Sequence, residues 1–108
     1  MLVEQQNTSL DETNADASSI LWTLSDSYCR LILKNIKNIP KSCMEISAEC
    51  KIPISTVYRR IQQLQDQNLV HVSGTISDDG KKFFLYKSKI KSLSASFNDK
   101  LTVNITYS

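Results

Sequence analysis

The stretch from Ile52 to Leu64 constrains the fold most, because its side chains separate into an apolar and a polar face when it is drawn as a helix. At about 100° per residue, the apolar side chains of Val57, Ile61 and Leu64 point within about 40° of one direction. A helix with one such stripe is stabilised mainly by packing that stripe on other elements. The rest of the chain is therefore expected to supply a core beneath this segment.

The opposite face of this segment carries side chains that can bind DNA. It contains Ser55, Arg59, Gln62 and Asp66, with Thr56 and Gln63 at its margins. Arginine can form paired hydrogen bonds to guanine or phosphate, glutamine can pair with the edge of adenine, and Ser and Thr can reach bases or phosphates. We therefore expect a DNA-recognition helix. The alternative is an ordinary surface helix, whose outer face has a similar composition.

Two helices are expected near the N-terminus of the ordered part. A serine pair at 18–19 can cap a helix over residues 18–24, and an apolar stripe indicates a second helix over 26–36. Pro40 prevents this second helix from continuing much further. Trp22 in the first helix is expected to anchor either the core or a dimer surface.

A third helix completes a helix-turn-helix. Ser42 and Glu45 form a capping box, which predicts a helix that begins there and ends near Cys50. The short segment 51–53 then turns the chain into the polar-faced helix described above. Two short helices joined by a tight turn, the second with polar residues at its exposed start, are typical of a helix-turn-helix.

After Asn68 the apolar period changes from that of a helix to that of a strand. Residues 69–76 and 81–87 are rich in β-branched and aromatic side chains and flank an Asp-Asp-Gly turn, so they predict a hairpin. A helix-turn-helix followed by a hairpin is a winged helix, and we expect an α+β fold that is mostly helical. Lys81 and Lys82 would then lie beside DNA phosphates; the alternative is that hairpin tips are commonly charged.

The last segment alternates between apolar and polar residues and predicts a second hairpin over 93–107. Leu101, Val103, Ile105 and Tyr107 share one face, which is too apolar for a free surface. This face either pairs two copies of the chain or folds back on its own domain, and both outcomes stay open. A symmetric dimer would present two recognition helices to a pseudo-palindromic site.

Charge is distributed unevenly along the chain. The net charge is +2, but the segment before Tyr28 contains five acidic residues and no Lys or Arg, so it carries −5 and the remainder +7. We expect three parts: an acidic disordered tail over 1–17, a winged-helix DNA-binding domain over 18–88, and a C-terminal hairpin over 89–108 that is a possible dimerisation element. A basic domain attracts polyanions such as double-stranded DNA.

Other classes of protein fit the sequence poorly. There is no apolar run of membrane-spanning length and no signal peptide, so we expect a cytoplasmic protein with no membrane partner. Nor is there a glycine-rich phosphate loop or a metalloprotease motif, and we expect no enzymatic activity and no cofactor. The competing class is a protein-interaction module of a transcription or replication complex, because winged helices also dock proteins without reading bases.

The three cysteines lack the spacing of a metal site. Cys43 and Cys50 are seven residues apart, which places their side chains two turns, about 10 Å, apart on one side of a helix. Cys29 could approach them in a folded core, so a three-thiolate site or a redox switch stays open. A structural role for all three thiols is favoured, and a metal or small-molecule effector is not expected.

Two segments resemble a known family. Residues 20–33, with the sequence ILWTLSDSYCRLIL, and residues 55–61, with the sequence STVYRRI, are similar to those of the ArsR-like winged-helix transcription regulators of archaea. The resemblance spans about 18–107. It implies a sequence-specific DNA-binding protein, commonly dimeric, that represses or adjusts transcription.

The resemblance also assigns residues to the recognition helix, namely Ser55, Thr56, Tyr58, Arg59 and Arg60. Two departures from the family are visible. Pro53 stands where many relatives have Ser or Asn, so the helix is expected to begin without a side-chain cap. The closely spaced cysteine pair of the metal sensors in the wider family is absent.

Overall fold

The computed structural model describes residues 6–11 and 15–108, and within them the chain forms four helices and five strands. They are β1 (Gln6–Asp11), α1 (Ala15–Ser25), α2 (Ser27–Asn35), α3 (Cys43–Cys50), α4 (Ile54–Asp66), β2 (Val70–Ile76), β3 (Lys82–Ser88), β4 (Ile90–Phe97) and β5 (Leu101–Tyr107). The expected α+β class is confirmed. The chain is not mostly helical, however, because the strands contain nearly as many residues as the helices.

Helices α2, α3 and α4 pack around one core with the first residues of β2. Ile32, Ile36, Ile46 and Leu64 are fully buried there. The helix ends follow the local signals: Asp26 caps α2 by accepting from the backbone N–H of Cys29, and Ser42 and Glu45 form the expected capping box of α3. These caps fix where the helices begin, and therefore which faces reach the core.

The end of α4 directs the chain into the first hairpin. Asn68 takes a left-handed conformation with a φ of 59°, and the N–H of Leu69 donates to the carbonyl of Leu64 at 2.9 Å. This is a Schellman arrangement, in which the last helical carbonyls are satisfied and two apolar side chains meet. Strands β2 and β3 then pair in antiparallel fashion, from Val70 opposite Ser88 to Ile76 opposite Lys82.

The second hairpin belongs to a three-stranded antiparallel sheet in which β5 lies between β1 and β4. Helix α1 covers one face of this sheet. Val103 and Ile105 of β5 are completely buried in a cluster that includes Ala17 and Ile20 of α1. Of the two outcomes left open for this apolar strip, the structure shows the one in which the strip is covered within the same chain, which removes that reason for dimerisation.

The expectation of a disordered tail over 1–17 is wrong for the described part of that segment. Residues Gln6–Asp11 pair with β5, from Gln6 opposite Tyr107 to Asp11 opposite Thr102, and α1 already begins at Ala15. Residues 1–5 and 12–14 lie outside the described residues. The structure also groups α1 with the C-terminal sheet, so the expected boundary at residue 89 does not separate two packing units.

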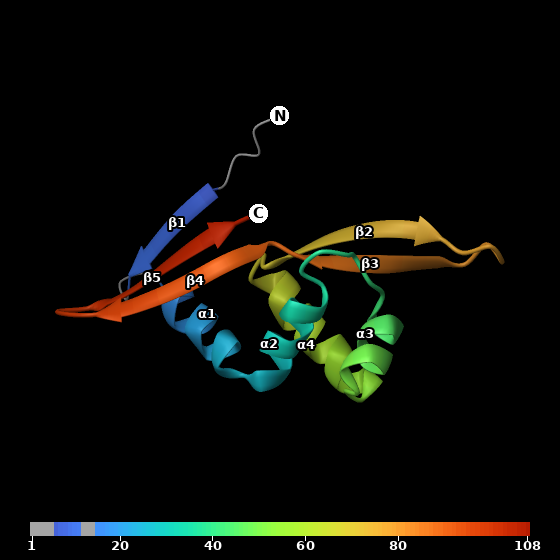
Figure 1. Cartoon of the computed structure of the whole chain (residues 1–108), viewed down its shortest axis with the longest axis horizontal. Coiled ribbons are helices and arrows are strands. Elements are labelled where there is room, and N and C mark those ends of the chain that lie inside the picture. The colour runs from blue at the N-terminus through green and yellow to red at the C-terminus, as the bar shows by residue number, and fades with distance from the viewer. Residues whose placement is uncertain (1–5, 12–14) are drawn as a thin grey trace.

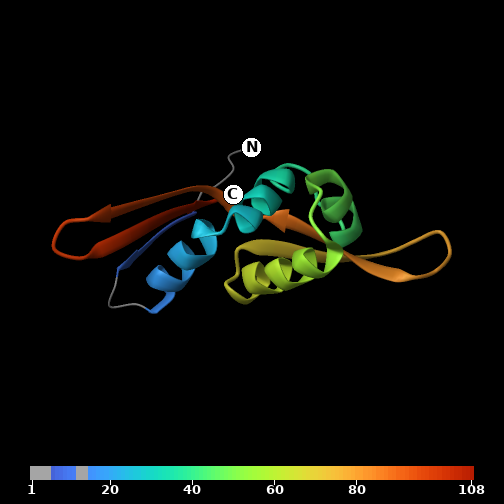
Figure 2. The ribbon, with the colours of Figure 1, turned by 90° about the horizontal axis from the view of Figure 1, so that it is seen from below.

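The molecule is elongated, with extents of 55 × 38 × 20 Å. The β2–β3 and β4–β5 hairpins project in opposite directions from the helices, and β3 leads almost directly into β4 (Figure 1). Seen from below, α1 lies beneath the β4–β5 hairpin and beside the C-terminal end of α4 (Figure 2). No described helix combines the length and apolarity that crossing a bilayer requires.

Candidate functional site

Helix α4 has the two faces expected from its sequence. Val57, Ile61 and Leu64 are buried in the core, whereas the opposite face is open to solvent. The exposed side chains on this face are Ser55, Tyr58, Arg59, Gln62 and Asp66, and Thr56 is partly exposed. Gln62 donates to Asp66 one turn later at 2.9 Å, while the structure gives Arg59 no described partner. Arg59 is therefore the cation of α4 that has no hydrogen bond or ion pair among the described residues.

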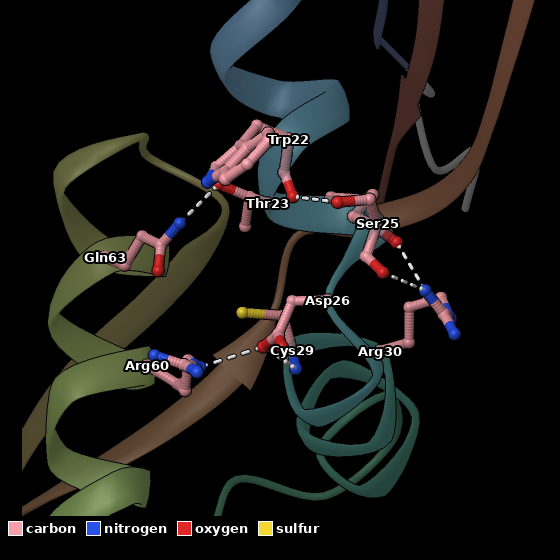
Figure 3. A network of polar contacts seen from close by, with 9 residues as sticks. Trp22, Thr23, Ser25, Asp26, Cys29, Arg30, Arg60 and Gln63 are labelled. Atoms are coloured by element: carbon pink, nitrogen blue, oxygen red, sulfur yellow. Dashed lines mark hydrogen bonds and ion pairs between the residues drawn. The ribbon is translucent and has the colours of Figure 1, made fainter.

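Two residues assigned to the recognition surface are instead used inside the molecule. Arg60 lies 2.8 Å from the carboxylate of Asp26, the cap of α2, and Gln63 donates at 2.8 Å to the buried hydroxyl of Thr23 in α1 (Figure 3). Directly after α4, Gln67 donates to the backbone carbonyl of Ser19 at 3.2 Å. Arg60 and Gln63 thus hold α4 against α1 and α2, and we remove both from the candidate interface.

Helical periodicity could not predict whether Arg60 and Gln63 face solvent or the neighbouring helices. Both lie at the margin between the exposed and buried faces, where a side chain can turn either way. Their partners are 34 and 40 residues away in the sequence. Only the docking of α1 and α2 beside α4 decides that these groups face protein.

The first turn of α4 is open, as the proline predicted. Pro53 occupies the cap position, and no described side chain accepts a hydrogen bond there. The leading N–H groups of a helix carry partial positive charge and suit an anionic oxygen such as a phosphate. Lys51, two residues earlier, is exposed and has a left-handed φ of 57°. Lys51 was not among the residues expected at this surface, although its place in the turn before α4 could have identified it.

The β2–β3 hairpin carries two adjacent cations. Lys81 and Lys82 are exposed near its tip, and the ammonium of Lys82 lies 5.4 Å from the centre of the Phe84 ring. Asp79 is held within the turn by the hydroxyl of Ser77 and the N–H of Lys81. These hydrogen bonds lower the pKa of Asp79, so its negative charge persists beside the two lysines.

One hollow connects the hairpin to α4. It has a volume of about 310 Å³, and its walls include Tyr58 of α4, Met44 of α3, and Lys82 and Phe84 of β3. The exposed aromatic ring of Tyr58 therefore faces the same space as the hairpin cation. This hollow joins α4, at Tyr58, to the hairpin, at Lys82 and Phe84.

The cysteines lie in surroundings that disfavour the thiolate. Burial, together with the neighbouring Asp26, raises the pKa of Cys29 to about 12, and burial also raises the pKa of Cys43 and Cys50. Thiols with raised pKa values are protonated at neutral pH and react slowly. Among the described residues, no group of three His, Cys, Asp or Glu side chains is placed to hold a metal ion. Cys29 and Cys43 are buried in the core of α2, α3 and α4, and Cys50 packs against this core.

Asp26 links the packing of α4 to pH. Partial burial acts to raise the pKa of Asp26, but its hydrogen bond from Cys29 and the Arg60 guanidinium outweigh this effect and lower it below its ordinary value of 3.8. A depressed carboxyl pKa stabilises the folded state at pH values above the ordinary value. This contribution is lost as the pH falls through the lowered pKa.

We expect Asp26→Ala to lower the free energy of unfolding by about 1–2 kcal/mol at neutral pH, because it removes a helix cap and a partly exposed ion pair. The difference from wild type should shrink as the pH falls below 3.8. Urea unfolding across this range measures it, with the exposed Asp78→Ala as the control. A difference that is the same at all pH values would contradict the role of the Asp26 charge.

Compared with known proteins, the chain matches no protein-family model and no curated protein.

Proposed function

We propose that this protein is a DNA-binding transcription regulator of the winged-helix type. In this proposal α4 enters the major groove, and the β2–β3 hairpin is the wing that lies along the phosphate backbone. The observation that carries the proposal is the single surface formed by α4 and the hairpin, on which Arg59 is unpaired among the described residues and Tyr58 shares a hollow with Lys82. The resemblance to ArsR-like regulators over residues 20–33 and 55–61 supports it.

Each part of this surface has a distinct role in the proposal. Arg59 and Gln62 contact the edges of bases in the major groove, since their side chains can form paired hydrogen bonds with guanine and adenine. Ser55, Thr56, Lys51 and the uncapped first turn of α4 are suited to phosphates, which fix the register of the helix in the groove. Lys81 and Lys82 add sequence-independent contacts from the wing. This arrangement separates base recognition from general affinity.

We also propose that two copies bind one pseudo-palindromic site. The interface differs from the one expected from sequence, because the strip on β5 is buried. Trp22 on α1 is 77% exposed, so it does not anchor the core, and Phe97 at the end of β4 is 74% exposed. Large exposed aromatic side chains are suitable anchors for a contact between copies. Sedimentation of the protein–duplex complex counts the copies.

A protein-docking module is the second candidate, favoured by a specific feature of the wing. Ile76 is 71% exposed, and Phe83 and Phe84 are also exposed. Two aspartates at the tip, Asp78 and Asp79, offset the two lysines in net charge. An apolar, nearly neutral hairpin suits a protein partner. Titration of random duplex DNA discriminates the candidates: binding that falls steeply with salt supports the regulator, and no binding at low salt supports the docking module.

Replacing Lys81 and Lys82 together by alanine tests the wing. We expect affinity to fall to a similar extent for all DNA sequences, and the slope of log K against log salt to flatten by up to about two units, since about two phosphate contacts are lost. Fluorescence anisotropy at several salt concentrations measures both quantities. Lys100→Ala is the control, because Lys100 lies in the turn between β4 and β5, where it pairs with Asp11 at 3.0 Å. An unchanged salt slope would show that the wing does not touch phosphate.

A further inference from the structure

A groove lies between two parts of the molecule: the core of α2, α3 and α4, and the cluster formed by α1 with the three-stranded sheet. None of the residues that line it belongs to α4 or to the tip of the β2–β3 hairpin. The groove has a volume of about 650 Å³, within the roughly 300–1,000 Å³ of small-molecule sites. Helix α1, helix α2 and the first residues of β4 form its walls. Its apolar lining consists of Leu21, Leu24, Leu33, Ile90 and Leu93. An apolar surface of this kind gains free energy when a hydrocarbon chain displaces water from it.

Every charged side chain that lines the groove is positive. Arg30 and Lys34 lie on α2, Lys37 lies two residues after its end, and Lys91 comes from β4; no described acidic residue lines the groove. Arg30 donates to the last carbonyls of α1, those of Leu24 and Ser25, at 2.8 and 2.9 Å (Figure 3). The three lysine ammonium groups have no hydrogen bond or ion pair within the described residues. Their charge is therefore uncompensated beside an apolar surface.

We propose that this groove binds a free long-chain carboxylate. The hydrocarbon chain lies on the leucines and Ile90, and the carboxylate meets the ammonium groups of Lys34, Lys37 and Lys91. Charge complementarity selects this occupant: a cationic amphiphile is repelled by the same rim, and a small anion gains nothing from the apolar lining. Binding there covers apolar surface that is otherwise exposed to water.

Isothermal titration calorimetry with dodecanoate, below the concentration at which it forms micelles, tests the proposal on the full chain. We expect saturable binding of dodecanoate and no binding of dodecyltrimethylammonium, which has the same chain length and the opposite charge, or of hexanoate at equal concentration. Binding of both dodecyl compounds would indicate hydrophobic adsorption and overturn the proposal. Equal binding of hexanoate would indicate a plain anion site and overturn it as well.

The variant Lys34→Gln with Lys37→Gln tests the position of the head group. We expect dodecanoate to bind roughly 3- to 30-fold more weakly, since two partly exposed charge contacts are lost, while the unfolding curve stays unchanged. Lys100→Gln is the matched control and should bind like wild type. Unchanged affinity of the double variant would contradict the proposed orientation of the ligand in the groove.

Methyl NMR spectra locate the hydrocarbon chain without any substitution. Dodecanoate should shift the methyl signals of Leu21, Leu24, Leu33 and Leu93 and leave those of Val72 and Ile76 on the wing unchanged. Shifts confined to the wing would overturn the assignment. Dissociation of a dimer on adding dodecanoate, seen by sedimentation, would show that a second copy occupies the groove and would also overturn it.

Discussion

Replacing Ile105 by alanine is expected to lower the free energy of unfolding by about 2–5 kcal/mol, the range found for truncating a fully buried Ile or Leu. Ile105 is completely buried between β5 and α1, in the cluster that contains Ala17, Ile20 and Val103. The substitution leaves a cavity under α1. Few neighbouring side chains can move to fill it, because only one helix packs on this face of the sheet. Urea unfolding followed by circular dichroism measures the loss.

The apolar face of β5 could be covered by its own chain or by a second copy. The dependence of this loss on protein concentration distinguishes these two roles. If α1 of the same chain covers Ile105, the loss is the same at low and high protein concentration. If the strip were a contact between copies, stability would depend on protein concentration and so would the effect of the substitution. Asn104→Ala, at the exposed neighbouring position of β5, is the matched control and should be nearly neutral.

Replacing Arg59 by alanine is expected to weaken specific DNA binding by about 1–3 kcal/mol and to relax the preference at one base pair of the site. Arg59 lies opposite Val57 and Ile61 on α4, is exposed, and has no described partner within the chain. Its removal therefore costs contacts with DNA and leaves the core intact. Titration against the preferred duplex and against single-base variants measures both effects.

Arg60→Ala is the matched control, because it removes the same side chain one position along the helix. Arg60 pairs with Asp26 at 2.8 Å, so this substitution should lower the free energy of unfolding while the base preference is retained. The pair of variants thus separates base recognition from helix docking. If Arg59→Ala binds the preferred and altered duplexes like wild type, Arg59 does not read a base.

Local patterns in the sequence were sufficient to place most helices and both hairpins. The capping box at Ser42 and Glu45 and the stripe of Val57, Ile61 and Leu64 depend on side chains within one or two turns of each other. The β2–β3 hairpin likewise depends on a local turn between two runs of strand-forming residues. Interactions of this range are encoded by neighbouring residues, so they can be read without knowing how the elements pack.

Sequence alone also selected part of the candidate surface. Ser55, Arg59 and Gln62 were assigned to the outer face of α4 by the helical period, and the structure exposes them. The DNA contacts proposed for them stay a prediction. Gln6–Asp11, by contrast, has little apolar alternation and gave no sign of being a strand, because its conformation depends on pairing with β5 nearly a hundred residues later.

What the sequence by itself determined is therefore the local part of this protein: where most helices and turns lie and which side of α4 is apolar. The tertiary structure decided which element covers each apolar face and which polar side chains remain available. It buried Ile105 beneath α1 instead of leaving it for a second copy, and it committed Arg60 and Gln63 to Asp26 and Thr23. The physical reason is range: periodicity reports on neighbours a few residues apart, whereas these contacts form between segments that only folding brings together.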